Sequence, residues 1–143
     1  MTVQAILLPV FVQVFLCFGL LILTGRRRFA DVRTGAVQAG DVSCGEKAWP
    51  AASQQAANAY ANQFELPVLF FVLVPLAMAT RKADLLFVVM SWVFVGSRIV
   101  HAGIYVSRNH VPARFGAFLV GTLVLGAMWA VFAIRILSTP LPP

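Results

Sequence analysis

The chain has 143 residues, of which 60% are hydrophobic and only 11% charged, and its formal net charge is +6. This composition excludes an ordinary water-soluble domain and makes a lipid bilayer the expected solvent. The length fits one domain, residues 1–143, with four spans of about 20 residues each. The basic residues lie in short loops beside apolar stretches, which indicates membrane topology rather than nucleic-acid binding.

The first apolar stretch, from about residue 4 to 24, predicts a retained membrane-spanning helix. Its basic residues follow the apolar stretch instead of preceding it, unlike those of a cleaved signal peptide. Arg26, Arg27 and Arg28 end the span, because charged side chains are costly in the hydrocarbon core; the first two are interpreted as topological charges. Residues 25–55 are polar and predict one long loop.

Three further spans are predicted over residues 56–79, 84–106 and 112–137. Pro67 and Pro75 fall inside the first of them and are expected to kink it. Asp84 is a suitable N-cap for the next helix, and Pro112 suits the first turn of the last. The predicted fold is therefore all-α, an integral membrane four-helix bundle.

Loop charge predicts the orientation of the bundle. The first loop holds five of the 11 basic residues, including Arg33 and Lys47, and the third loop holds Arg108, whereas the second loop holds Arg81 and Lys82. Because basic residues in short loops favour the cytoplasm, both termini are expected to face away from it.

Polar residues from separate spans are predicted to meet at one depth, near the cytoplasmic ends. They are Arg28, Asn58, Asn62, Glu65, Arg98, His101, Tyr105 and Arg114. Helical spacing places those of the second span on one stripe and those of the third on another. A charge at the centre of a membrane helix costs about 2.5–3.5 kcal/mol, so these groups should face partners or a ligand.

Structural alternatives exist for several of these residues. Glu65 and Arg98 suit a structural ion pair, and Asn62 suits an interhelical hydrogen bond. His101 alone is more typical of a hydrogen-bonded histidine, because a haem or metal site needs further ligands, and only His110 is available. Neither a metal site nor a Cys17–Cys44 disulfide is predicted. Arg114 adds charge to the free N–H groups of a helix start, which favours an anionic ligand.

Four motifs carry a resemblance to a known family. The segment Asn62-Gln63-Phe64-Glu65-Leu66-Pro67, the pattern Arg98-x-x-His101-x-x-x-Tyr105 and the pair Pro112-x-Arg114, with Thr24-Gly25-x-x-Arg28, resemble the MAPEG family, the membrane-associated proteins of eicosanoid and glutathione metabolism. The resemblance is to bacterial-type members and implies an integral protein of the bacterial inner membrane. It also implies a homotrimer with glutathione as co-substrate, bound between subunits near the cytoplasmic face.

The resemblance further implies roles for single residues. Glutathione contacts are expected from Arg28, Asn62, Glu65, Arg98, His101, Tyr105 and Arg114. Glu65 would receive the amine, arginines the carboxylates, and Arg114 would lie closest to the sulfur. The chain departs from the family pattern at Asn58, where many members have arginine, and at Phe118, where several have tyrosine.

The expected function is a glutathione-dependent transferase or peroxidase that acts on a lipophilic electrophile or lipid hydroperoxide from the bilayer. A fixed cation at Arg114 would stabilise the glutathione thiolate. The alternative is a non-catalytic lipid or small-molecule binding protein on the same scaffold. A proton-coupled exporter is disfavoured, because Glu65 is near a span end rather than the midplane.

Overall fold

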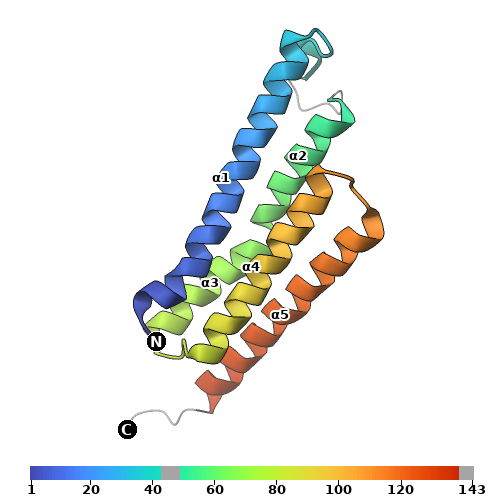
Figure 1. Ribbon diagram of the computed structural model, residues 1–143. Coiled ribbons are helices and arrows are strands. Elements are labelled where there is room, and N and C mark those ends of the chain that lie inside the picture. Colours follow the sequence, from blue (N-terminus) through green and yellow to red (C-terminus); the bar gives the residue numbers. More distant parts are fainter. Residues whose placement is uncertain (43–48, 139–143) are drawn as a thin grey trace.

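The computed structural model describes residues 1–42 and 49–138 of the chain, and all secondary structure in these residues is helical. The elements in chain order are α1 (Val3–Arg33), η1 (Ala39–Val42), α2 (Ala51–Ala61), η2 (Asn62–Phe64), α3 (Leu66–Ala79), α4 (Leu85–Val106) and α5 (Val111–Leu137). In Figure 1, α2 and α3 follow one another end to end and form one of four roughly parallel rods. The prediction of an all-α four-helix bundle is confirmed.

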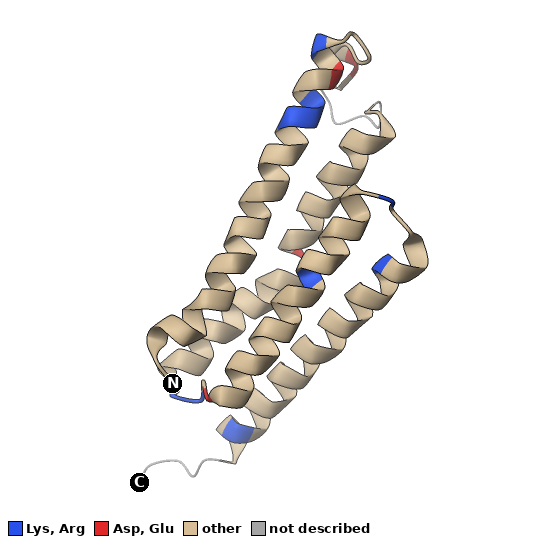
Figure 2. Ribbon diagram, in the orientation of Figure 1, with Lys and Arg blue, Asp and Glu red and all other residues tan. Residues whose placement is uncertain are grey.

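The rods are long and apolar enough to cross a membrane. Large hydrophobic side chains such as Phe15, Ile22 and Leu123 are more than half exposed on their outer faces. Figure 2 shows that most charged residues lie toward the two ends of the bundle and few along its middle. Both features match a bilayer, where apolar surface needs no burial and charge is expelled from the core.

Helix α1 ends at Arg33 rather than near Thr24, and α2 begins at Ala51, so the predicted loop over residues 25–55 was wrong at both of its ends. The extension of α1 is bound to its neighbours. The Arg27 guanidinium donates to the carbonyls of Ala52 at 2.6 Å and Val106 at 3.1 Å, and the Ser53 hydroxyl donates to Asp31. Arg27 thus joins α1 to the start of α2 and the end of α4, a role beyond topology. Cys44 and Lys47 lie outside the described residues.

The predicted second span is present as one membrane-spanning segment, Ala51–Ala79, but its regular α-helix ends at Ala61 and resumes at Leu66, so it is interrupted and not only kinked. Glu65 between them has φ −100° and ψ −105°, outside the helical region. Pro67 lacks the N–H that would bond the carbonyl four residues earlier, so the ladder cannot continue unchanged through this segment. Pro75, in contrast, stays inside α3.

A pair of buried glutamines supports the break. Gln63 donates its side-chain N–H to the Ala59 carbonyl at 2.8 Å and accepts from the Gln13 amide at 2.9 Å. Both glutamine side chains are fully buried. Polar groups in an apolar bundle must be paired, and this pair ties α1 to the segment where the helix stops.

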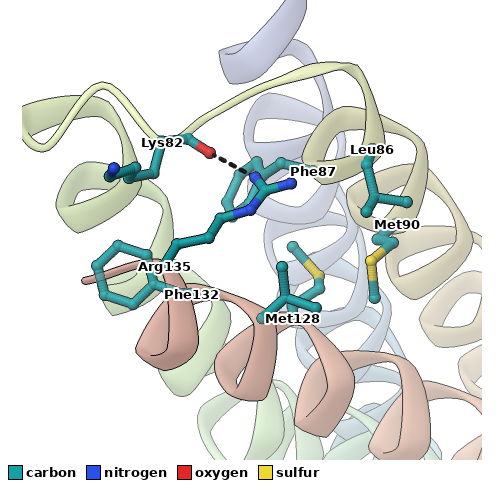
Figure 3. Close-up of a pocket in the computed structure, with 8 residues that line it drawn as sticks. Lys82, Leu86, Phe87, Met90, Met128, Phe132 and Arg135 are labelled. Carbon is teal, nitrogen blue, oxygen red and sulfur yellow. Dashed lines mark hydrogen bonds between the residues drawn. The ribbon is translucent and has the colours of Figure 1, made fainter. Parts of the chain in front are cut away.

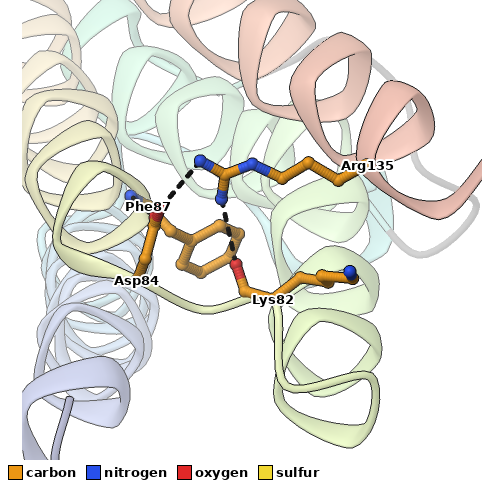
Figure 4. Close-up of polar contacts among 4 residues, drawn as sticks. All are labelled: Lys82, Asp84, Phe87 and Arg135. Atoms are coloured by element: carbon orange, nitrogen blue, oxygen red, sulfur yellow. Dashed lines mark hydrogen bonds and ion pairs between the residues drawn. The ribbon is translucent and has the colours of Figure 1, made fainter. Parts of the chain in front are cut away.

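The end of the bundle at the α3–α4 turn is closed by a polar clamp (Figure 4). Asp84 caps α4 by accepting from the Phe87 N–H at 3.0 Å, which confirms its predicted role. Its carboxylate also pairs with Arg135 of α5 at 2.7 Å, and Arg135 donates to the Lys82 carbonyl at 3.3 Å. The hydrogen bond from Arg135, more than that from Phe87, holds the pKa of Asp84 below its ordinary value. Beneath the clamp the side chains leave a cavity of only about 10 Å³ (Figure 3).

Helices α4 and α5, which match the predicted helices over 84–106 and 112–137, approach closely at Gly121. A Cβ atom added there would lie 2.6 Å from the Ser97 hydroxyl oxygen, which donates to the Phe94 carbonyl at 2.6 Å. At Gly126, on the same helix, an added Cβ meets nothing within 4 Å. Among the glycines that the structure describes, only Gly121 is therefore required by packing within the chain.

We predict that Gly121→Ala unfolds at a lower temperature than Gly126→Ala in the same detergent. The difference should be about 1 kcal/mol, because Ser97 must turn away and lose its hydrogen bond. The double variant Gly121→Ala/Ser97→Ala should recover most of the loss. Equal stability of the two single variants would show that this contact is not tight.

Candidate functional site

A pocket of about 290 Å³ opens between α4 and α5, beside η2. Four of the predicted site residues line it: Asn62, His101, Tyr105 and Arg114. The remaining lining is apolar and comes from Val111, Phe115 and Phe118. The structure therefore brings together polar groups from the α2–α3 break, the last turns of α4 and the first turn of α5.

Arg114 is held in place from two sides. Its guanidinium carbon lies 4.0 Å from the centre of the Tyr105 ring, and one of its nitrogens donates to the Asn109 side-chain oxygen at 2.6 Å. Asn109 has a left-handed φ of 48°, which asparagine tolerates better than most residues. The result is a half-buried cation of fixed position at the pocket wall. Sequence reasoning missed Asn109, because its role depends on the turn that precedes α5.

His110 serves α5 as an N-cap. Its Nδ1 accepts from the Ala113 N–H at 3.3 Å, and its carbonyl accepts from the Arg114 N–H at 3.0 Å. The ring thus occupies one of the free N–H groups at the helix start. In the described part of the chain, no three histidine, cysteine or carboxylate side chains gather as metal ligands.

His101 forms a buried part of the pocket wall. Its side chain is 3% exposed, and its Nδ1 has no hydrogen-bond partner. The ring lies 5.9 Å from that of Tyr105 and 6.0 Å from that of Phe118, centre to centre. A buried ring nitrogen without a partner is unusual, and the His101 residue to which it belongs lines the pocket.

Asn62 and Glu65 act as a unit at the break. With its nitrogen toward the carboxylate, the Asn62 amide donates to both Glu65 oxygens at 3.1 and 3.2 Å. The Glu65 side chain is exposed within the single subunit and so remains open to a further donor. Asn58, one of the departures from the family pattern, accepts instead from the Gln54 amide at 2.7 Å.

Arg98 lies beside the pocket, not in its lining. The residue is 1% exposed, and one of its nitrogens donates to the Asn62 carbonyl at 3.3 Å. Its Nε and a second terminal nitrogen have no partner. Within the described residues Arg98 makes no ion pair with Glu65, so the predicted structural pair is not formed. Arg98 instead supports the backbone of the break and keeps unused donors.

Arg28 is not among the residues that line this pocket. Its guanidinium carbon stacks over the Trp49 ring at 4.7 Å, and its Nε is buried without a partner. The pocket of Arg114 therefore does not include Arg28, which instead contacts Trp49.

The combined chemistry of the pocket is that of an anion site with one acidic partner. A fixed cation at Arg114, a hydroxyl at Tyr105 and the buried imidazole of His101 surround it, while Glu65 is the one carboxylate nearby in the described chain. Such a set suits a small molecule that carries carboxylate or thiolate groups together with an amine.

The comparisons with known proteins give one match. The family described as the MAPEG family matches residues 6–134, nearly the whole chain. No curated protein and no solved structure matches the chain.

We predict that Arg98→Met leaves the protein without ligand as stable as the wild type, or more stable by about 1–3 kcal/mol. The reason is that buried donors without partners cost free energy, which a methionine of similar length avoids. Thermal unfolding in detergent would measure this, with Phe94→Ala as a core control that should lose about 3–5 kcal/mol. A loss at Arg98→Met as large as that of the control would make Arg98 a structural residue only.

Proposed function

The chain belongs to the MAPEG family and is an integral membrane protein, and on this premise we propose that it is a glutathione-dependent transferase or peroxidase. Members of this family generally use glutathione, which is a thiol with two carboxylates and one amine. The proposal rests on the pocket that combines the fixed cation of Arg114 with the buried imidazole of His101, whose Nδ1 has no hydrogen-bond partner.

Binding of glutathione would use the charges of the site in pairs. Glu65 receives the amine, and the Asn62 amide keeps the carboxylate oriented for it. The arginines receive the carboxylates of the tripeptide, with Arg98 offering unused donors and Arg28 contributing from its place beside Trp49. His101 and Tyr105 supply further hydrogen bonds within the pocket. Arg28, Arg98 and His101 would then gain partners for buried nitrogens that have none in the free protein.

Arg114 would stabilise the thiolate of glutathione. A free thiol has a pKa of about 8.5, and a nearby fixed cation lowers it, so that the thiolate predominates near neutral pH. The proton leaves to solvent, and the sulfur attacks a lipophilic electrophile, forming a carbon–sulfur bond as the leaving group departs with its electron pair. With a lipid hydroperoxide, the sulfur attacks the terminal oxygen, the O–O bond breaks, and the departing alkoxide takes a proton from solvent to give an alcohol. A second glutathione then reduces the resulting sulfenic acid to the disulfide and water.

The lipophilic substrate would arrive from the bilayer along the apolar part of the pocket. Val111 and Phe115 are 56% and 61% exposed at its edge, so an apolar molecule dissolved in lipid meets no charged barrier there. The polar substrate and the apolar one would thus meet at Arg114.

A non-catalytic binding protein is the second candidate, and two observations favour it. The Asn58 amide is occupied by Gln54 and offers no cation for a carboxylate. Phe118 presents a ring without a hydroxyl between Arg98 and His101. Both features weaken thiol binding or activation without closing the pocket.

We predict that Arg114→Ala lowers the rate of conjugation about 10²–10³-fold, the loss typical when a single charge-stabilising donor is removed. The ultraviolet absorbance of bound thiolate should disappear with it, while Arg114→Lys should retain part of both signals. Arg108→Ala, an exposed arginine in the preceding turn, is the matched control and should resemble the wild type.

The same assay separates the two candidates. Turnover of a generic aryl halide or a lipid hydroperoxide supports the enzyme, whereas saturable glutathione binding without turnover supports the binding protein. Unchanged thiolate absorbance and rate in Arg114→Ala would remove Arg114 from the mechanism.

We also propose a homotrimer in the bacterial inner membrane, with both termini facing away from the cytoplasm. The separation of Arg28 from the Arg114 pocket in one subunit supports an assembly in which a neighbour completes the site. Cross-linking in native membranes should give a trimer as the largest species. A dimer at saturating cross-linker would contradict this assembly.

A further inference from the structure

At the other end of the bundle, α1 begins beside the α3–α4 turn (Figure 1). Residues of these two segments line a second polar pocket. Its volume is about 250 Å³, and it is lined by Met1, Val3, Ile6, Met78, Arg81 and Ala83. It shares no residue with the pocket of Arg114, and the proposed function leaves it unused.

Arg81 is the charged group of this pocket, and its backbone is unusual. It has a left-handed φ of 57°, at the position after α3 where glycine is the usual residue. The Arg81 and Lys82 N–H groups close the helix by donating to Met78 at 3.0 Å and Ala77 at 2.8 Å. A side chain in this conformation costs about 1–2 kcal/mol that glycine would avoid. Arg81 therefore makes the fold less stable than glycine would at this position, and its exposed side chain lies at the pocket.

No acidic side chain in the described chain neutralises Arg81. The nearest acid along the sequence, Asp84, is committed to Arg135 at 2.7 Å and to the Phe87 N–H (Figure 4). Asp84 is the one carboxylate among residues 80–84, so its pairing with Arg135 leaves no acid of this turn for Arg81. The first turn of α1, which opens on the same pocket, contains no acid either. This end of the bundle is complementary to an anion.

An apolar hollow continues from the pocket along α1. It has a volume of about 520 Å³ and is lined by Val3, Gln4, Ala5, Leu7, Leu8 and Phe11. Val3 belongs to both hollows, and Leu8 and Phe11 are each 51% exposed. The helix rises about 12 Å from Val3 to Phe11, so the hollow is long enough to hold a large part of an extended acyl chain.

We infer that this surface binds an anionic phospholipid, with its phosphate at Arg81 and an acyl chain in the hollow along α1. The cation of Arg81 lies next to the apolar hollow, just as the charged headgroup of a lipid lies next to its acyl chains. Both are at an end of the bundle where a membrane surface is expected. A free phosphate ion would share the contact with Arg81 but would gain nothing from the apolar hollow.

The test compares lipids on the full chain in a neutral detergent. Thermal unfolding is followed during titration with phosphatidylglycerol, with phosphatidylcholine of the same acyl chains, and with inorganic phosphate. The wild type should be stabilised most by phosphatidylglycerol. Arg81→Gln should bind it about five-fold more weakly, the factor for one juxtamembrane cation, and Arg81→Lys should retain most of the affinity.

Two further variants keep the result interpretable. Arg81→Gly removes the charge and the backbone strain together, so it should unfold at a temperature no lower than the wild type and still lose the preference for phosphatidylglycerol. Arg26→Gln removes an exposed charge at the opposite end and should keep that preference. The inference is overturned if Arg81→Gln binds phosphatidylglycerol as the wild type does, if Arg26→Gln weakens binding equally, or if inorganic phosphate protects as well as the lipid.

Discussion

The architecture depends on a missing hydrogen bond. Pro67 has no N–H to give, and inside an apolar bundle no water is available to replace it. The chain responds by leaving the α-helix from Asn62 to Glu65, and the side chains of Gln63 and Arg98 bond the carbonyls of Ala59 and Asn62. The same interruption turns the Asn62 amide onto the Glu65 carboxylate. In another helix such a break would only lower stability. In this chain it creates the position of Glu65, the carboxylate of the candidate site.

The four rods were predictable from the sequence, because long apolar runs bounded by charge have few alternatives in a bilayer. The helix starts followed from local chemistry, as Asp84 at the N-cap of α4 and Pro112 in the first turn of α5 illustrate. The continuation of α1 through Arg33 was not predictable, since polar and charged residues there fit a loop equally well. Its helical state depends on distant partners, the carbonyls of Ala52 and Val106.

The candidate site, like the fold, was predictable from the sequence only in part. Helical periodicity placed His101 and Tyr105 on one face of α4, and the pocket contains both. Periodicity failed for Asn58, Asn62 and Glu65, because their stripe assumed a continuous helix through the break. The acceptor for Arg114 at Asn109 and the ring of Phe118 near Arg98 depend on side-chain directions in turns and at helix crossings, and spacing alone carries no information about these.

The length of α1 has a consequence for access. Its 31 residues extend over about 46 Å, whereas the hydrocarbon layer is about 30 Å thick. Roughly a third of the rod must therefore stand in water or among headgroups, and its arginine-rich end is the part least able to remain in lipid. A water-borne peptide and a molecule dissolved in the acyl layer would consequently reach the bundle by perpendicular routes, one along the rods from the aqueous side and the other between them from the plane of the membrane.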